Sequence, residues 1–178
     1  IIDIFRNIYG PEIDLCHRLD KYTSGCLVLA KNKQSVKHFN ILLKKREIEK
    51  IYLTIVKGNL IKNQTVNIPL YKKNKMKSKE SISTFKKIKN LKGCSLVKVK
   101  IYTGRTHQIR LHASLIHHPI IFDDKYGDRS FNNKLSKKFK RKIALHSQEI
   151  KFKDQHSKKI TVKCKNPEHI DKYIELLR

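Results

Sequence analysis

The stretch HRLDKYTSGCLVLAKN, residues 17–32, joins a polar motif to a turn and then to a short apolar run. The run at residues 25–32 is continuous, rich in branched side chains and opened by the turn, which predicts a buried strand. Asp20 directly precedes the turn, so its carboxylate is expected near the surface at the mouth of the strand. Because Asp often starts turns by bonding its own backbone, a purely structural role for Asp20 stands beside a catalytic one.

Patterns downstream alternate between strand and helix. Residues 35–50 place apolar side chains on one helical face, and IYLTIVKG at 51–58 alternates as a strand does. A turn on Gly104 followed by a helix is predicted for GRTHQIRLHASL, residues 104–115, and a closing helix for residues 167–178. Further strands are predicted at 81–88, 95–104, 144–152 and 158–164. With no repeat or linker, the chain is predicted to be one α+β domain.

The balance of 41 Lys plus Arg against 15 Asp plus Glu gives a formal charge of +26, which indicates a polyanionic partner. Nucleic acid is the first candidate and an anionic membrane surface the second. No apolar run is long enough for a membrane helix, and residues 1–20 show no signal-peptide pattern. Two Lys-rich segments, 71–81 and 129–142, are predicted to lie at the surface, where the first is a loop or hairpin that either touches phosphates or is simply solvated.

The cysteines and histidines show no metal-binding or disulfide spacing. Cys16, Cys26, Cys94 and Cys164 include no CxxC pair, and the nine histidines include no HExxH motif. We therefore predict no metal, and buried reduced thiols in a reducing compartment. Whether that compartment is the cytoplasm or an organelle with its own translation stays open.

The segment GRTHQIR, residues 104–110, supplies two arginines and a glutamine within one turn and helix. A buried Arg is the natural partner of an acid that must stay ionised away from water. An ionised carboxylate can act as a nucleophile. Spacing alone does not show that this segment meets Asp20.

Four motifs in this order, HRLDKYTSGCLVLAKN, KIYLTIVKG, GRTHQIRLHASLIHHPI and DDKYG, resemble the RNA pseudouridine synthases of the RluA/RluD type. The resemblance extends from about residue 15 to residue 152, and the combination of HRLDxxTSG with GRTHQIRxH is highly specific. It implies a mixed, mainly antiparallel central sheet flanked by helices and loops. It also implies a monomeric isomerase that detaches uracil from ribosomal or transfer RNA, turns the base and reattaches it through carbon, without cofactor or metal.

The resemblance implies a role for each matching residue. Asp20 would be the nucleophile, and Tyr52, which by pattern alone reads as a core aromatic, would stack on the target base and help remove its C5 proton. Arg110 would pair with Asp20. Arg18 would contact the RNA around the extruded nucleotide or fill the space that the base leaves.

Three further residues of the GRTHQIR segment are expected at the RNA. Arg105 would bind RNA directly, whereas His107 and Gln108 would either hold the turn or touch RNA. An alternative is a catalytically silent RNA-binding or ribosome-assembly module, which an intact catalytic trio argues against. A basic DNA-binding domain would need a helix-turn-helix or finger pattern, and the sequence has none.

The chain departs from the family pattern at two glycine positions and at its start. His117 and Phe122 stand where the family usually has glycine, which leaves the loop conformation there open because glycine serves backbone shapes that side chains resist. The sequence starts close to HRLD. We therefore expect residues 1–178 to be one catalytic domain that lacks the preceding strand and any accessory RNA-binding domain.

Overall fold

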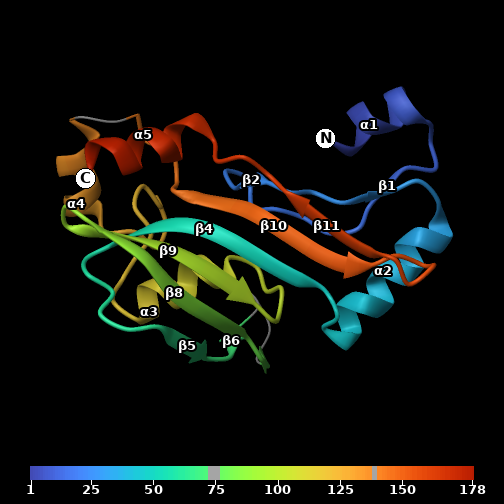
Figure 1. The fold of residues 1–178 in the computed structure, drawn as a ribbon, viewed down its shortest axis with the longest axis horizontal. Coiled ribbons are helices and arrows are strands. Elements are labelled where there is room, and N and C mark those ends of the chain that lie inside the picture. The colour runs from blue at the N-terminus through green and yellow to red at the C-terminus, as the bar shows by residue number, and fades with distance from the viewer. Residues whose placement is uncertain (72–76, 138–139) are drawn as a thin grey trace.

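The computed structural model describes residues 1–71, 77–137 and 140–178 (Figure 1). The helices are α1 (Ile2–Tyr9), α2 (Lys33–Lys45), α3 (Gln108–Leu115), α4 (Arg129–Ser136) and α5 (Glu168–Leu176). The strands are β1 (Asp14–Leu15), β2 (Ser24–Gly25), β3 (Leu29–Ala30), β4 (Glu49–Lys57), β5 (Gln64–Asn67), β6 (Leu70–Tyr71), β7 (Ser78–Lys79), β8 (Ile82–Leu91), β9 (Cys94–Ile101), β10 (Leu145–Lys153) and β11 (Lys159–Lys163). The structure therefore contains both helices and strands, in agreement with the predicted α+β class.

The central sheet has the order β11-β10-β4-β9-β8-β5, with neighbouring strands antiparallel. The short strand β2 joins β10 in parallel, which makes the sheet mixed but mainly antiparallel and confirms the predicted architecture. Figure 1 shows α3 behind β8 and β9, and α5 beside the start of β10. No helix among the described residues is long and apolar enough to cross a membrane.

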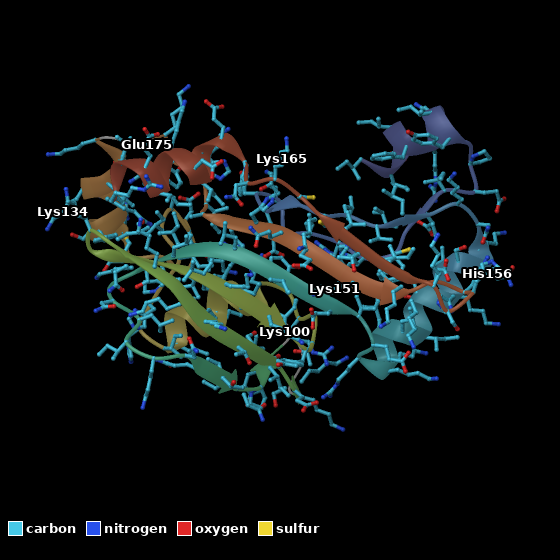
Figure 2. The ribbon with its side chains drawn as sticks, viewed as in Figure 1. Lys100, Lys134, Lys151, His156, Lys165 and Glu175 are labelled. Carbon is cyan, nitrogen blue, oxygen red and sulfur yellow. The ribbon has the colours of Figure 1, made fainter. Side chains whose placement is uncertain are left out.

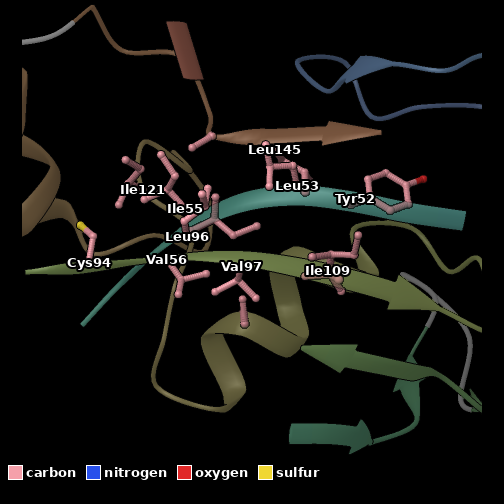
Figure 3. Close-up of a cluster of buried hydrophobic side chains, with 14 of the residues drawn as sticks. Tyr52, Leu53, Ile55, Val56, Cys94, Leu96, Val97, Ile109, Ile121 and Leu145 are labelled. Atoms are coloured by element: carbon pink, nitrogen blue, oxygen red, sulfur yellow. The ribbon is translucent and has the colours of Figure 1, made fainter. Parts of the chain in front are cut away.

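The main hydrophobic core lies along β4 and β9, whose side chains pack with those of α3 and α5 (Figure 3). Ile55, Val56 and Val97 in these strands are fully buried. A second, smaller core surrounds α2, where Phe39 and Leu42 pack against Ile48 and Ile150. The first core fixes the strand that carries Tyr52, and the second supports the segment that leads to Asp20.

The long strands and the helices α2, α3 and α5 confirm the sequence patterns, but the prediction of one buried strand at residues 25–32 is wrong. The run divides into β2, which pairs with β10, and β3, which pairs with β1. Gly25 has a positive φ of 112°, and the pairing with β10 ends after Cys26, whose amide still donates to the Ser147 carbonyl. An apolar run indicates that a segment is buried, but it does not indicate which strand the segment pairs with.

The segment 129–142 has more structure than the sequence predicts, whereas the segment 71–81 agrees with the hairpin alternative. Within 129–142, residues of α4 form a helix in which Asp128 caps the Phe131 amide at 2.8 Å and Asn132 is buried. At 71–81, the strands β6 and β7 pair antiparallel, and the Lys-rich residues 72–76 lie outside the described residues.

The two positions that depart from the family's glycines keep a glycine-like backbone. His117 has a φ of 61° and Phe122 a φ of 58°, both in the left-handed region. This conformation costs an L-residue about 1–2 kcal/mol. At Phe122 burial of the ring against Tyr173, with centroids 5.2 Å apart, offsets the strain. Both positions therefore adopt the left-handed backbone that glycine favours.

Gly25→Ala should destabilise the protein by about 2–3 kcal/mol, since the new Cβ combines backbone strain with overpacking. That Cβ would lie 2.1 Å from the Ser147 carbonyl oxygen. Gly93→Ala is the matched control, because Gly93 also has a positive φ, of 66°, but its Cβ would meet nothing closer than 3.6 Å. The control should lose only about 1 kcal/mol. Chemical denaturation of both variants measures the difference, and equal losses would show that β2 does not depend on close contact with β10.

Candidate active site

A cavity of about 570 Å³ opens where the HRLD segment, β4 and the turn before α3 meet. Six of the seven residues that the sequence singles out line it: Arg18, Asp20, Tyr52, Arg105, His107 and Gln108. The seventh, Arg110, lies behind Asp20. The fold thus brings together segments that are separated by some 90 positions in the chain.

Asp20 sits in a turn that the backbone closes without help from the carboxylate. The Thr23 amide donates to the Asp20 carbonyl oxygen at 2.9 Å, and the Asp20 carboxylate has no hydrogen-bond partner among the described residues. Its nearest cationic atom is Nη1 of Arg110, 3.8 Å from Oδ2. This arrangement does not support a role for Asp20 in turn formation alone, and it leaves the carboxylate free to face the cavity.

Arg110 is held mainly by an acid that the sequence reasoning did not single out. Its Nε and Nη2 donate to the two Asp123 oxygens at 2.7 and 2.8 Å, and its guanidinium lies 5.2 Å from the Tyr126 ring centroid. Burial favours the neutral Asp123 carboxyl, but the hydrogen bonds from Arg110 and the Tyr126 and Lys125 amides outweigh it and lower its pKa. Asp123 therefore orients Arg110, and Arg110 presents its remaining nitrogen to Asp20.

Tyr52 lies in the middle of β4, at one end of the buried cluster, with its hydroxyl directed away from the other apolar side chains (Figure 3). The residue is only 7% exposed. Burial raises the pKa of Tyr52 to about 12, the Asp20 charge adds to the shift, and a hydrogen bond with Ser147 opposes it. The phenol is therefore neutral at physiological pH.

Gln108 and His107 differ in what they can offer a ligand. Gln108 is buried, its Oε1 accepts from the Thr103 hydroxyl and the Arg105 amide, and its Nε2 donates to the Ile82 carbonyl and the Ser83 hydroxyl. This geometry favours the turn-holding role for Gln108 over RNA contact.

His107 begins α3 with a left-handed φ of 55°, and its Nδ1 lies 3.1 Å from the Tyr126 hydroxyl. Burial, followed by the charge of Arg110, lowers the pKa of His107 and keeps the ring neutral. Its position on the cavity wall leaves RNA contact open.

Five cations but only one acid, Asp20, line the cavity among the described residues. Arg18 is exposed and has no partner in the described part of the chain, whereas Nε of Arg105 donates to the Glu80 carbonyl at 3.0 Å. Lys44, Arg46 and Lys50 complete the set and were not among the sequence candidates. Lys50 is 8% exposed, and burial, then Arg105, lowers its pKa. Its position directly before the Ile51–Tyr52 pair on a strand is the only sequence signal that could have found it.

No group of three His, Cys, Asp or Glu side chains among the described residues could hold a metal ion. Among the described residues, the cavity offers one carboxylate, the buried neutral phenol of Tyr52 and a basic rim. Such a set suits a substrate that carries phosphates and a reaction that needs a nucleophile and a proton carrier.

Comparison with known proteins agrees with this chemistry. The sequence model of the family described as RNA pseudouridylate synthase matches residues 6–115. Ribosomal large subunit pseudouridine synthase C of Vibrio vulnificus is 32% identical over 176 residues, covering 93% of this chain and 56% of the relative. The protein of the same name from Salmonella typhi is 35% identical over 153 residues, covering 79% of this chain and 48% of the relative. The chain thus spans about half the length of these curated relatives.

Two solved human structures share the fold. RNA Pseudouridylate Synthase Domain Containing 4 superposes with a TM-score of 0.82 at 21% identity, covering 99% of this chain and 81% of the other. RNA Pseudouridylate Synthase Domain Containing 1 gives a TM-score of 0.77 at 22% identity, with coverages of 97% and 82%. By the family match and the identity to its relatives, this chain belongs to the RNA pseudouridylate synthase family.

Proposed function

We propose that this chain is the catalytic domain of an RNA pseudouridine synthase that converts a specific uridine of ribosomal or transfer RNA to pseudouridine. The observation that carries the proposal is Asp20, the one acid among the described residues that line a basic cavity, facing Arg110 at 3.8 Å. The relatives' names make large-subunit ribosomal RNA the first substrate to test.

The reaction would begin when the basic rim binds the phosphates that flank the target and the uridine leaves its stack. Unstacking costs on the order of a few kcal/mol, which the phosphate contacts must offset. The Asp20 carboxylate then acts as the nucleophile while the bond between ribose and uracil N1 breaks. Arg110 lies 3.8 Å from the carboxylate and orients it for this step.

After the base has turned, a bond forms between the ribose and uracil C5, and the proton on C5 must leave. A neutral Tyr52 can take it only if its own hydroxyl proton passes to another acceptor at the same time. The Asp20 carboxylate, released from the ribose, lines the same cavity and is the only acidic group among the described lining residues. Tyr52 would thus relay the proton rather than act as a free phenolate.

The proposal is tested by incubating the chain with large-subunit ribosomal RNA and transfer RNA and mapping pseudouridines, in parallel with RNA from cells with and without the protein. A new site in vitro that disappears from the deficient cells supports the proposal. RNA binding with no pseudouridine formed would favour the silent RNA-binding module.

RNA binding should weaken by about 10³-fold or more between roughly 50 and 200 mM salt if about six phosphates are neutralised. Not every cation is available, since Lys100 and Lys151 (Figure 2) both hold Glu49. Lys44→Gln, at the cavity rim, should reduce the salt slope by about one, whereas Lys172→Gln on α5 should not. Affinity measured over a salt series tests this. A nearly flat dependence would mean that most of the positive charge does not take part in RNA binding.

Tyr52→Phe should slow product formation by about 10²–10³-fold and leave RNA affinity nearly unchanged, because the ring stays and the proton carrier is lost. Single-turnover assays with tritium at uracil C5 report the step. Tyr102→Phe is the matched control, since Tyr102 also lines the cavity but is 41% exposed. Unchanged tritium release from the Tyr52 variant would remove its hydroxyl from the mechanism.

A further inference from the structure

Two cysteines 138 positions apart converge at one edge of the central sheet. Sγ of Cys26 and Sγ of Cys164 lie 3.0 Å apart. The convergence follows from the topology, because β4 occupies one side of β10, so β2 and β11 must share the other side. Each cysteine comes directly after one of these two strands.

The backbone holds both cysteines in place. The Cys26 amide donates to the Ser147 carbonyl and the Cys164 amide to the Gln148 carbonyl, each at 2.8 Å. The two residues are therefore anchored on consecutive carbonyls of the same strand. A disulfide has a sulfur–sulfur bond of about 2.05 Å, so the sulfurs need to approach by only about 1 Å.

The two thiols differ in access. Cys26 is 4% exposed and its Sγ lies 3.7 Å from the carbonyl oxygens of Gln148 and Val162, whereas Cys164 is partly exposed. A small oxidant can therefore reach Cys164 first. Cys16 and Cys94 are buried as well, and neither has a thiol within hydrogen-bonding distance among the described residues.

We propose that Cys26 and Cys164 form an oxidative modification site that takes a low-molecular-weight disulfide of the glutathione class and becomes an internal disulfide. In the first step Cys164 loses its proton, its thiolate attacks one sulfur of the small disulfide, and one small thiol leaves with that proton. In the second step Cys26 loses its proton and attacks Sγ of Cys164, and the second small thiol leaves. Two protein thiols are oxidised by two electrons and one small disulfide is reduced to two thiols.

The surroundings predict which step is slow. Burial, followed by the hydrogen bond with Cys164, raises the pKa of Cys26 to about 12. Little Cys26 thiolate is therefore present at neutral pH, and the second step limits the rate. The short distance between the sulfurs raises the rate of this second step despite the low thiolate fraction, because the attack is intramolecular.

The bond would fasten β2 to β11 and thereby restrain the segment that follows Asp20. It closes a loop of more than 100 residues, which strongly restricts the unfolded chain. The inference concerns the thiols alone and does not rest on the proposed function.

The test exposes the reduced, folded chain to oxidised glutathione, blocks remaining thiols and maps peptides by mass. We expect a single Cys26–Cys164 linkage, reversal by dithiothreitol, and an unfolding midpoint raised by at least about 5 °C. Hydrogen exchange over residues 20–30 should slow in the oxidised form. Cys164→Ser should abolish the linkage, and Cys94→Ser should retain it.

Two results would overturn the proposal. One is a folded chain that stays reduced, or stops at a glutathione adduct on Cys164, while the unfolded chain oxidises readily. The other is a mixture of linkages that includes Cys16 or Cys94. Because no RNA takes part, neither result bears on the proposed activity.

Discussion

Asp20→Asn is expected to reduce pseudouridine formation by about 10⁴-fold or more while the protein stays folded and binds RNA. Asn keeps the size and shape of the side chain but carries no negative charge and is a poor nucleophile. RNA affinity should stay similar or rise slightly, since the change removes the only acid among the described residues lining a basic cavity.

Stability separates this expectation from a structural role. Arg110 keeps its two hydrogen bonds to Asp123, so loss of the Asp20 charge should lower the free energy of unfolding by less than about 1 kcal/mol. Asp124→Asn is the matched control, since Asp124 is exposed and next to Asp123 in the chain, and it should change neither turnover nor stability. Turnover and thermal unfolding are measured on both variants. Near-normal turnover by Asp20→Asn would end the catalytic interpretation of the HRLD motif.

Periodicity in the sequence was sufficient to predict the main elements but not their partners. The ends of the strand predicted at 51–58 lie within two residues of those of β4, because alternation over a long run is typical of a strand and not of a helix. The run at 25–32 divides between two sheets because β10 and β1 both offer edges nearby, and no local pattern encodes that choice.

Sequence motifs predicted six residues that line the cavity, whereas residues whose role depends on packing were missed. Asp20 and Arg110 come from motifs, yet their contact arises from the path of α3 beside the turn. Asp123 and Lys50 are both buried, which the sequence pattern does not indicate. In the fold, Asp123 is the main partner of Arg110 and Lys50 lines the cavity. For Gln108 the motif left RNA contact open, but in the fold its side-chain amide is buried and hydrogen-bonded within the protein.

Asp123→Asn should lower the free energy of unfolding by about 3–5 kcal/mol, because it leaves a buried guanidinium without its main counterion. The Asp123 side chain is fully buried and that of Arg110 is 12% exposed, so solvent screens the pair little. The unfolding midpoint should fall by about 6–20 °C. Glu168→Gln is the control, since it breaks an ion pair in which Glu168 is 81% exposed, and no measurable change is expected.

The pH dependence of stability identifies the charge as the cause. Because folding lowers the pKa of Asp123, its contribution is fully present above the unfolded value of about 3.9 and is lost as the pH falls through the folded value. The gap in stability between wild type and Asp123→Asn should therefore be widest near pH 7 and narrow below about pH 4. A gap that stays constant with pH would assign the loss to the amide's shape rather than to the missing charge.

Turnover gives the second readout, since Asp123 is buried, does not line the cavity and holds Arg110 in position. Freed from its main partner, Arg110 should swing toward Asp20 or solvent, and turnover should fall by about 10-fold or more at temperatures where the variant is still folded. Arg110→Met removes the same pair from the other side, so adding it to Asp123→Asn should cause less further loss of stability than Arg110→Met causes alone. Strictly additive losses would show that the two residues stabilise the protein independently, and the pair could not then be what holds Arg110 against Asp20.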